Sequence, residues 1–91
     1  MAKYRRKPTV VEASQWLPDM DNYPGQGKPD ELGVIWQFNS EGHVSNGIVT
    51  TIHGQKTKVA IRDWVIVEPD GVHHYPCKPD IFEQTYEPVE S

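Results

Sequence analysis

Residues 64–75, which read WVIVEPDGVHHY, decide the fold that this sequence predicts. Trp64–Val67 is a wholly apolar, mostly β-branched run, which is typical of a strand in the middle of a sheet. Glu68–Gly71 has the composition of a type I turn, with proline second, aspartate third and glycine fourth. Val72–Tyr75 is therefore expected to return as the antiparallel partner of the apolar strand.

The residues that follow predict a short helix and a last strand. Pro76 has no N–H to donate, so strand pairing is expected to stop there. Pro79 presets the backbone angle of a first helical residue, and Asp80 suits the positive end of the helix dipole. After this helix, residues 84–87 are expected to form an edge strand that Pro88 ends.

Upstream of the apolar strand the pattern indicates a second hairpin. Asn46 and Gly47 form a typical turn dipeptide. The β-rich runs Ile48–His53 and Lys56–Ile61 flank a glycine-containing connection. The sequence therefore predicts two antiparallel arms over these residues.

The amino-terminal part predicts one strand, a loop and an ambiguous segment. Thr9–Trp16 begins with β-branched residues, lies between two prolines and is expected to be a strand. Residues 17–30 contain three prolines, two glycines and three aspartates, which predicts a mobile loop. Residues 31–38 follow a proline and an acid, which favours one helical turn, and end in alternating large apolar residues, which favours a strand.

These elements predict an α+β, mostly β fold. We expect a small antiparallel sheet or partly open barrel of about five to six strands, with one short carboxyl-terminal helix, in a single small domain over residues 1–91. No run approaches the roughly 20 apolar residues of a membrane span, and the basic start lacks the apolar segment of a signal peptide. One cysteine excludes an internal disulfide.

Charge is distributed unevenly along the chain. Thirteen acidic against nine basic residues give a net charge of -4, which argues against general nucleic-acid binding, because such binding relies on neutralising phosphates. Bases gather near the start and acids near the end: Lys3, Arg5, Arg6 and Lys7 against Asp80, Glu83, Glu87 and Glu90. Termini that lie side by side explain this pattern, since paired strands often carry opposite charges. The alternative is a basic arm for a phosphate-bearing ligand.

His73, His74 and Cys77 are metal-ligating residue types that lie close in sequence. Successive strand residues point to opposite faces, so the two histidines are expected to diverge, and Cys77 has no second cysteine near it. We therefore predict neither a metal site nor a cofactor. The sequence contains no familiar catalytic motif, which predicts a protein that is not an enzyme. The alternative is a small hydrolase or transferase that uses Cys77 with His74.

Aromatic and basic residues interleave in a way that suits a nucleotide-like ligand. Trp64, Tyr75 and Tyr86 could stack a base while cations clamp phosphates. The candidate ligand-binding residues are Arg5, Arg6, His53, Lys56, Lys58, Trp64, Tyr75 and Lys78. In the structural alternative, Trp64 and Tyr75 form a cross-strand core pair, and the lysines at 56 and 58 protect an edge strand from aggregation.

Three segments resemble a family of short proteins encoded by phages and prophages, especially those of actinobacteria. They read KYRRKPTVVEASQW at residues 3–16, TIHGQKTKVAIRDWVIVEPDG at residues 51–71 and YPCKPDIFEQTYEPV at residues 75–89. The resemblance implies a viral origin and a small β module with a short terminal helix, and it implies no particular chemistry. Arg62 departs from the pattern, which has glycine there. If that glycine needs a positive φ, Arg62 must be strained or adopt a different turn.

These observations predict a non-enzymatic accessory protein that acts in the cytoplasm of an infected host cell. It would inhibit a host protein, such as one of defence, or sequester a small nucleotide-like signal. A homo-oligomer is expected, because a symmetric interface can create a pocket that one small copy cannot hold. The alternative is a minor structural component of the phage particle.

Overall fold

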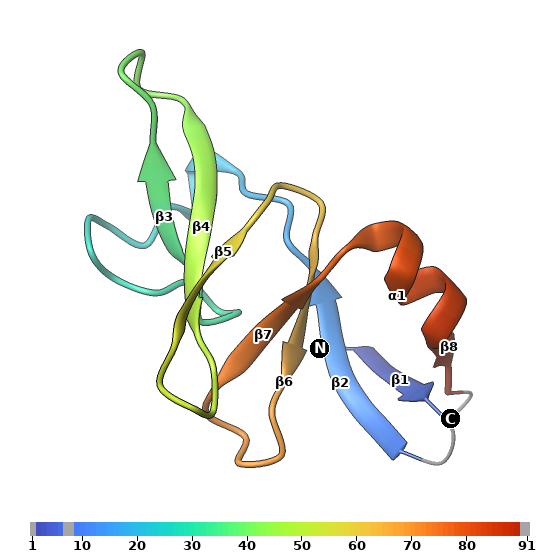
Figure 1. Ribbon diagram of the computed structural model, residues 1–91. Helices are drawn as coiled ribbons and strands as arrows, with labels where there is room; N and C mark the ends of the chain where they lie inside the picture. The colour runs from blue at the N-terminus through green and yellow to red at the C-terminus, as the bar shows by residue number, and fades with distance from the viewer. Residues whose placement is uncertain (1, 7–8, 90–91) are drawn as a thin grey trace.

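The computed structural model describes residues 2–6 and 9–89, without the side chains of Arg5, Arg6 and Thr9. The described residues form eight strands, one α-helix and one short 3-10 helix. The strands and the α-helix are labelled in Figure 1. The elements are β1 (Ala2–Arg6), β2 (Thr9–Gln15), η1 (Met20–Asn22), β3 (Ile35–Phe38), β4 (Val44–Thr50), β5 (Lys56–Val59), β6 (Trp64–Val67), β7 (His74–Cys77), α1 (Pro79–Thr85) and β8 (Glu87–Pro88).

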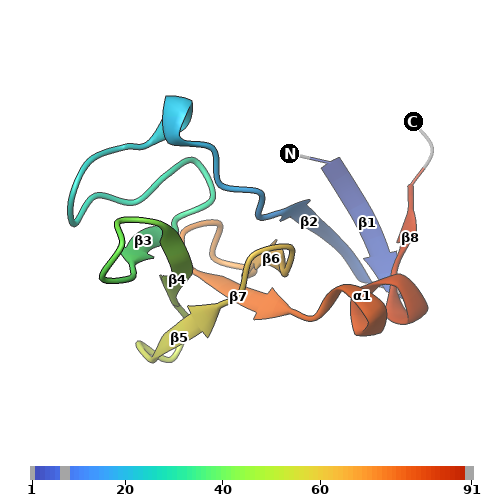
Figure 2. The same ribbon diagram turned by 90° about the horizontal axis from the view of Figure 1, so that it is seen from above.

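The strands form two antiparallel sheets. One has five strands in the order β7-β6-β2-β1-β8, and the other has three in the order β3-β4-β5. In Figures 1 and 2 the three-stranded sheet lies at one end of the molecule, and α1 and β8 lie at the other. The predicted mostly β class with one short carboxyl-terminal helix is confirmed. The strands are divided between two sheets, and residues 2–6 form a strand that the sequence analysis missed.

Strand β6 is buried on both faces, which explains its wholly apolar composition. Val65 and Ile66 are both fully buried, and as neighbours on a strand they point to opposite sides of the sheet. Val65 joins one hydrophobic cluster, and Ile66 joins the other. Apolar side chains are therefore needed at both positions, and the prediction of an interior strand at Trp64–Val67 is confirmed.

The first cluster joins the two sheets. Trp16, directly after β2, is 2% exposed and packs with buried residues of all three strands of the smaller sheet. Its partners are Val34, Trp36, Val49, Val59 and Val65. Trp16 and Trp36 meet edge to face, with ring centroids 6.2 Å apart, an arrangement that aromatic pairs prefer.

The second cluster lies between the five-stranded sheet and α1. Phe82, 1% exposed, is the buried residue of this helix. Its ring stacks on Trp64 at a centroid distance of 4.1 Å and meets Tyr4 edge to face at 4.8 Å. Pro79 begins the helix and Asp80 lies in its first turn, so the predicted helix start is confirmed.

Asp30 binds both indoles that join the sheets. Its Oδ2 accepts hydrogen bonds from Trp16 Nε1 at 3.0 Å and from Trp36 Nε1 at 2.8 Å. Its Oδ1 accepts from the backbone N–H groups of Leu32 and Val34 at 2.8 and 3.0 Å. The helical turn predicted after residue 30 is wrong, because this carboxylate captures the backbone donors in a turn. The strand predicted in the same segment is confirmed as β3.

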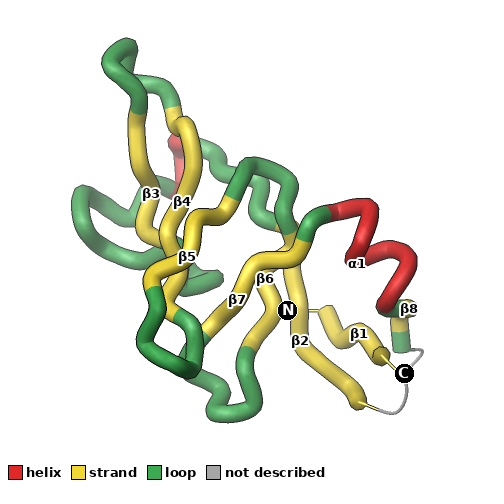
Figure 3. The backbone as a smooth tube through the Cα atoms, in the orientation of Figure 1, coloured by secondary structure: helices red, strands yellow, loops and turns green. Residues whose placement is uncertain are grey.

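The long connection between β2 and β3 contains η1 as its one helical segment, and Asp19 caps it by accepting from Asp21 N. Figure 3 shows this connection as an extended loop beside the smaller sheet. The prediction of a loop over residues 17–30 therefore agrees with the structure, apart from this short turn; its mobility stays a prediction.

Gly47 lies inside β4, opposite Trp36, so the turn predicted at residues 46 and 47 is wrong. A Cβ at this position would lie 2.1 Å from Val34 Cγ1 and 3.1 Å from the Trp16 ring. Glycine is required here for close packing of a tryptophan on the strand. A turn and a close approach of this kind both demand glycine, and the sequence alone does not distinguish them.

Two further predictions about β7 need correction. The strand spans residues 74–77 where residues 72–75 were expected, and Pro76 lies within it, opposite Val65. Because β7 is the outermost strand of its sheet, the missing N–H of a proline is tolerated. The turn before it is present, with Gly71 N donating to Glu68 O at 2.9 Å.

The termini lie side by side, as their charges predicted. Strand β8 pairs with β1, and the register places Glu87 opposite Arg5 and Pro88 opposite Tyr4. Lys7 and Glu90 lie outside the described residues. The edge strand expected at residues 84–87 is present only at its end, because α1 continues to Thr85. In the described chain, no helix is long and apolar enough to cross a membrane.

Arg62 has a φ of 81°, the left-handed conformation that glycine adopts without cost. Its backbone is fixed on both sides, because its N–H donates to Trp16 O at 2.9 Å and its carbonyl accepts from Gln15 Nε2 at 2.9 Å. Arg62 therefore keeps the turn that glycine would make, at the expense of strain.

Replacing Asp30 with alanine should destabilise the protein by about 3 kcal/mol, because it leaves two indole and two backbone donors without their acceptor. Urea denaturation followed by tryptophan fluorescence measures the loss. Asp19→Ala is the matched control: it removes one exposed hydrogen bond and should cost no more than about 1 kcal/mol. Equal costs for the two variants would contradict the central role of Asp30.

Replacing Arg62 with glycine should stabilise the protein by about 1 kcal/mol, since the relief of left-handed strain exceeds the added entropy of the unfolded chain. Arg62→Ala keeps the strain and should change the free energy of unfolding by less than about 0.5 kcal/mol. Both are measured by denaturant titration. A glycine variant no more stable than the alanine variant would show that the conformation is not strained.

Candidate functional site

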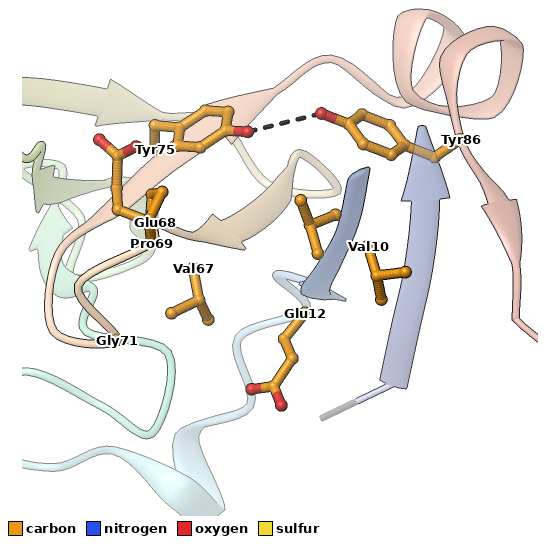
Figure 4. A pocket seen from close by; sticks show the side chains of 9 residues that line it. Val10, Glu12, Val67, Glu68, Pro69, Gly71, Tyr75 and Tyr86 are labelled. Carbon is orange, nitrogen blue, oxygen red and sulfur yellow. Dashed lines mark hydrogen bonds between the residues drawn. The ribbon is translucent and has the colours of Figure 1, made fainter. Parts of the chain in front are cut away.

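A hollow of about 670 Å³ opens on the five-stranded sheet, beside the turn between β6 and β7 (Figure 4). It is formed by the start of β2, the end of β6 with the following turn, Tyr75 of β7 and Tyr86 after α1. The lining residues are Val10, Val11, Glu12, Val67, Glu68, Pro69, Gly71, Tyr75 and Tyr86. Its volume lies within the range of roughly 300–1,000 Å³ that is usual for ligand pockets.

Two tyrosines form one wall of the hollow. Tyr75 comes from β7 and Tyr86 follows α1, and Figure 4 shows their hydroxyl groups pointing toward each other. The two oxygens lie 3.4 Å apart. The ring of Tyr86 stacks on Phe82 at a centroid distance of 4.8 Å, so the second core holds this wall in place.

The remaining surface of the hollow is apolar with two carboxylates. Val10, 53% exposed, and Val67 provide apolar surface below the tyrosines. Glu12 lies on the side away from the tyrosine pair, and Glu68 lies beside Tyr75. No lysine, arginine or histidine is among the described residues that line the hollow. The site is therefore apolar, aromatic and acidic.

The two carboxylates differ in what they bind. Glu68 Oε2 accepts a hydrogen bond from Ile52 N at 2.9 Å, which attaches the β4–β5 turn to the rim of the hollow. Lys3 is the cross-strand neighbour of Glu12, yet among the described residues the Glu12 carboxylate makes no ion pair. Glu12 is thus an exposed carboxylate without an ion pair to any side chain that the structure describes.

The predicted ligand-binding residues whose side chains the structure describes do not lie together. Tyr75 lines the hollow, whereas Trp64 packs in the second core against Phe82. His53, Lys56 and Lys58 are exposed on the β4–β5 hairpin. The backbones of Arg5 and Arg6 lie in β1, and their side chains lie outside the described part of the structure.

Lys56 and Lys58 share the exposed side of β5, an edge strand whose Val59 faces the first core. Lysines at such positions discourage pairing with other chains. Lys78 Nζ lies 3.4 Å from the carboxylate of Asp63, which is 3% exposed and also accepts from Ala60 N at 3.0 Å. The structural alternative thus accounts for Lys56 and Lys58, which lie on an edge strand. Lys78 has a structural role as the partner of the buried Asp63 carboxylate.

The adjacent histidines diverge as expected. His73 Nδ1 contacts the Asp70 carboxylate. This side-chain hydrogen bond, together with those from the backbone N–H groups of His73 and Val72, lowers the pKa of Asp70 to about 2. His74 packs against Gly33, where a Cβ would lie 2.6 Å from its Nδ1, and burial lowers its pKa. In the described ranges, no three histidine, cysteine, aspartate or glutamate side chains gather as a metal site would require.

Cys77 is a half-buried thiol whose pKa is raised, first by burial and then by the charges of Asp63 and Asp80. A cysteine nucleophile needs the opposite, a lowered pKa and a base within hydrogen-bond reach. His74 and Cys77 are three positions apart on β7 and so point to opposite faces of the strand. This geometry gives no support to the thiol chemistry considered as an alternative.

A second hollow of about 430 Å³ lies beside the long loop and is lined partly by Pro18, Pro29, Asp30 and Trp36. The Asp30 carboxylate in it already accepts four hydrogen bonds. The Asp30 carboxylate therefore serves the fold and has no hydrogen-bonding capacity left for a ligand.

Sequence reasoning found the two tyrosines of the first hollow but missed Val10, Glu12 and Glu68. Their proximity depends on the register of β2 against β6, in which Ala13 lies opposite Ile66. That register has no local sequence signal, since it follows from packing on both faces of the sheet.

In comparisons with protein-family models, curated proteins and solved structures, nothing matches this chain.

Iodoacetamide should alkylate Cys77 in the native protein at pH 7.5 more slowly than in the urea-unfolded chain, because the raised pKa leaves less thiolate. Mass spectrometry of timed samples gives both rates. Asp80→Asn removes one of the charges that raise the pKa and should speed the native reaction up to about twofold, whereas Glu83→Gln should not. Native labelling faster than that of the unfolded chain would indicate an activated thiol.

Proposed function

We propose that this protein is a non-enzymatic binding protein that contacts a partner protein through the hollow between β2, β6 and the tyrosine pair. The observation that carries the proposal is the combination of apolar surface, two tyrosines and an exposed carboxylate in a concave site. Binding surfaces are enriched in tyrosine, and anchor side chains of partners dock in pockets of this kind.

The composition of the hollow favours a protein partner over a nucleotide-like signal. A phosphate-bearing ligand needs cations or backbone N–H groups around it, and the described part of the lining contains Glu12 and Glu68 and neither lysine nor arginine. The described lysines first considered for phosphate binding lie elsewhere, on β5 and at the start of α1. Of the two modes of action expected for an accessory protein, inhibition by contact is therefore the one we propose.

The biological setting of the proposal comes from the sequence resemblance. The resemblance to short proteins encoded by phages and prophages supports an accessory role in the cytoplasm of an infected host cell, where the partner would be a host protein. The alternative is a minor structural component of the phage particle. Self-association into a homo-oligomer would use the same kind of surface, so the pair of variants described next also tests it.

A pair of surface variants tests the proposal. Val10→Arg fills the hollow and should abolish partner binding, whereas Ile61→Arg is a matched control, since Ile61 is similarly exposed and does not line the hollow. Tagged native and variant chains are used to capture proteins from an actinobacterial host extract, and each candidate is purified and titrated by calorimetry. We expect one host protein that binds the native chain and Ile61→Arg at least about tenfold more tightly than Val10→Arg.

Three results would contradict the proposal. A partner that binds both variants equally would exclude the hollow. Stoichiometric amounts of the chain in purified particles, without a host partner, would establish the structural alternative. A rise in melting temperature with a nucleotide, abolished by Val10→Arg, would show that the hollow serves a small ligand.

A further inference from the structure

We propose that the outer face of the three-stranded sheet binds an acidic amphipathic helix that a partner protein presents. The outer face is the side of β3, β4 and β5 that points away from the first core, and these strands lie side by side in Figure 1. Its residues do not line the hollow, so this contact stands apart from the proposed function. Three features carry the proposal: the register of the strands, two isoleucines and two lysines.

The register of the three strands defines the outer face. Val49 of β4 and Val59 of β5 are buried in the first core, so their neighbours along each strand point the opposite way. Ile48 therefore lies on the outer face, with Ile35 of β3 on one side and Lys58 of β5 on the other. The same alternation places four polar residues on this face: Gln37, Asn46, Thr50 and Lys56.

The two isoleucines form an apolar centre on the outer face. Ile35 and Ile48 are half-buried, and neither belongs to a hydrophobic cluster or is among the side chains that pack against one. On the larger sheet, α1 covers the apolar Ile66 with Phe82. Apolar surface on a sheet face is removed from water when a covering element packs on it. A covering element from a partner would therefore gain this burial at Ile35 and Ile48.

The two lysines give the outer face a positive charge. Lys56 and Lys58 are exposed, and neither forms an ion pair with another residue that the structure describes. The strands β3, β4 and β5 contain no aspartate or glutamate, although the whole protein has a net charge of -4. Protection of an edge strand explains lysines on β5, but it does not explain isoleucines beside them. An apolar centre with a positive margin favours a partner that is apolar and acidic.

A helix is the element that suits this face. A strand would pair with the edge of β5, which the lysines oppose, whereas a helix packs its apolar stripe on the face itself, as α1 does on the larger sheet. Lysines two apart on a strand are separated by roughly 7 Å, close to the roughly 6 Å rise between residues four apart on a helix. Two glutamates beside the apolar stripe can therefore meet Lys56 and Lys58 together. Single-stranded nucleic acid stacks on aromatic side chains, and the residues of this face include none.

The experiment uses a model helix as the probe. It is an alanine-based peptide with leucines spaced three and four residues apart and glutamates beside the leucine stripe. One control peptide has lysine in place of glutamate, and another has the same composition with leucines and glutamates mixed around the helix. Each is titrated into ¹⁵N-labelled native protein. We expect saturable amide shifts at residues 35–37, 46–50 and 56–58, with a Kd below about 1 mM for the acidic amphipathic peptide and at least about fivefold weaker binding of both controls.

Charge variants test the role of the lysines. The double variant Lys56→Gln with Lys58→Gln should weaken binding of the acidic peptide at least about threefold, because it removes two exposed ion pairs. The double variant Lys3→Gln with Lys28→Gln is the matched control, since it removes the same charge from exposed positions on β1 and in the long loop. Added salt should weaken binding to the native protein more than binding to the Lys56 and Lys58 variant.

An apolar variant tests the role of the isoleucines. Ile48→Thr should weaken binding at least about threefold, because less apolar surface is buried. Threonine keeps a β-branched side chain, and Ile48 lies outside both clusters, so the strand is preserved. Ile81→Thr is the matched control, since Ile81 is 53% exposed on α1, away from this face. Melting temperatures confirm that the variants are folded.

Several results would overturn the inference. Equal binding of the control peptides, or binding unchanged in the lysine variant or in Ile48→Thr, would show that the face does not select an acidic amphipathic helix. An oligonucleotide that binds this face as tightly as the acidic peptide would identify phosphate as the ligand. A dimer that buries the face and excludes the peptide, seen by light scattering, would identify a second copy as the occupant. None of these results touches the Val10→Arg test, so the two proposals stand or fail separately.

Discussion

The carboxylate of Asp30 is the group on which the arrangement of the two sheets depends. It receives hydrogen bonds from Trp16, which follows the centre strand of the larger sheet, and from Trp36 in β3 of the smaller one. Indole nitrogen only donates, so two indoles brought together in a core need an acceptor with two free lone pairs. An ionised aspartate supplies them and still has Oδ1 for the backbone of residues 32 and 34. Loop, sheets and core are thereby fixed by one side chain.

This short chain buries its apolar side chains in two small hydrophobic clusters, and strand β6 contributes to both. Trp16 and Val65 face the smaller sheet, while Ile66 and Trp64 face α1, so β6 contributes to both clusters. Side-by-side clusters give an elongated body of 43 × 24 × 21 Å. They also leave part of the larger sheet uncovered, because α1 ends at Thr85 and covers only one region. The first hollow lies where this cover stops.

Sequence patterns predicted the elements whose cause is local. Trp64–Val67 is a strand because its composition reflects burial on both faces, and α1 begins at Pro79 because proline suits a first helical turn. The failures involve residues whose role is set by distant partners. Gly47 makes room for Trp16 and Val34, and Pro76 is tolerated because β7 is an edge strand. The tyrosines of the candidate site were recognised by residue type, but Val10 and Glu12 join them only through strand register.

The hollow and the carboxyl-terminal segment are connected by packed aromatic rings. Tyr86, one wall of the hollow, is held by stacking on Phe82, and Phe82 is held by Trp64 and Tyr4. Immediately after Tyr86, Glu87 and Pro88 of β8 pair with β1, and Val89 N donates to Lys3 O at 3.3 Å. A ligand that contacts Tyr86 together with β2 would therefore add contacts between the last helix and the sheet that exist only in the folded state. By mass action, binding in the hollow must then stabilise the docking of α1 and β8, and any change that loosens this docking must weaken binding by the same free energy.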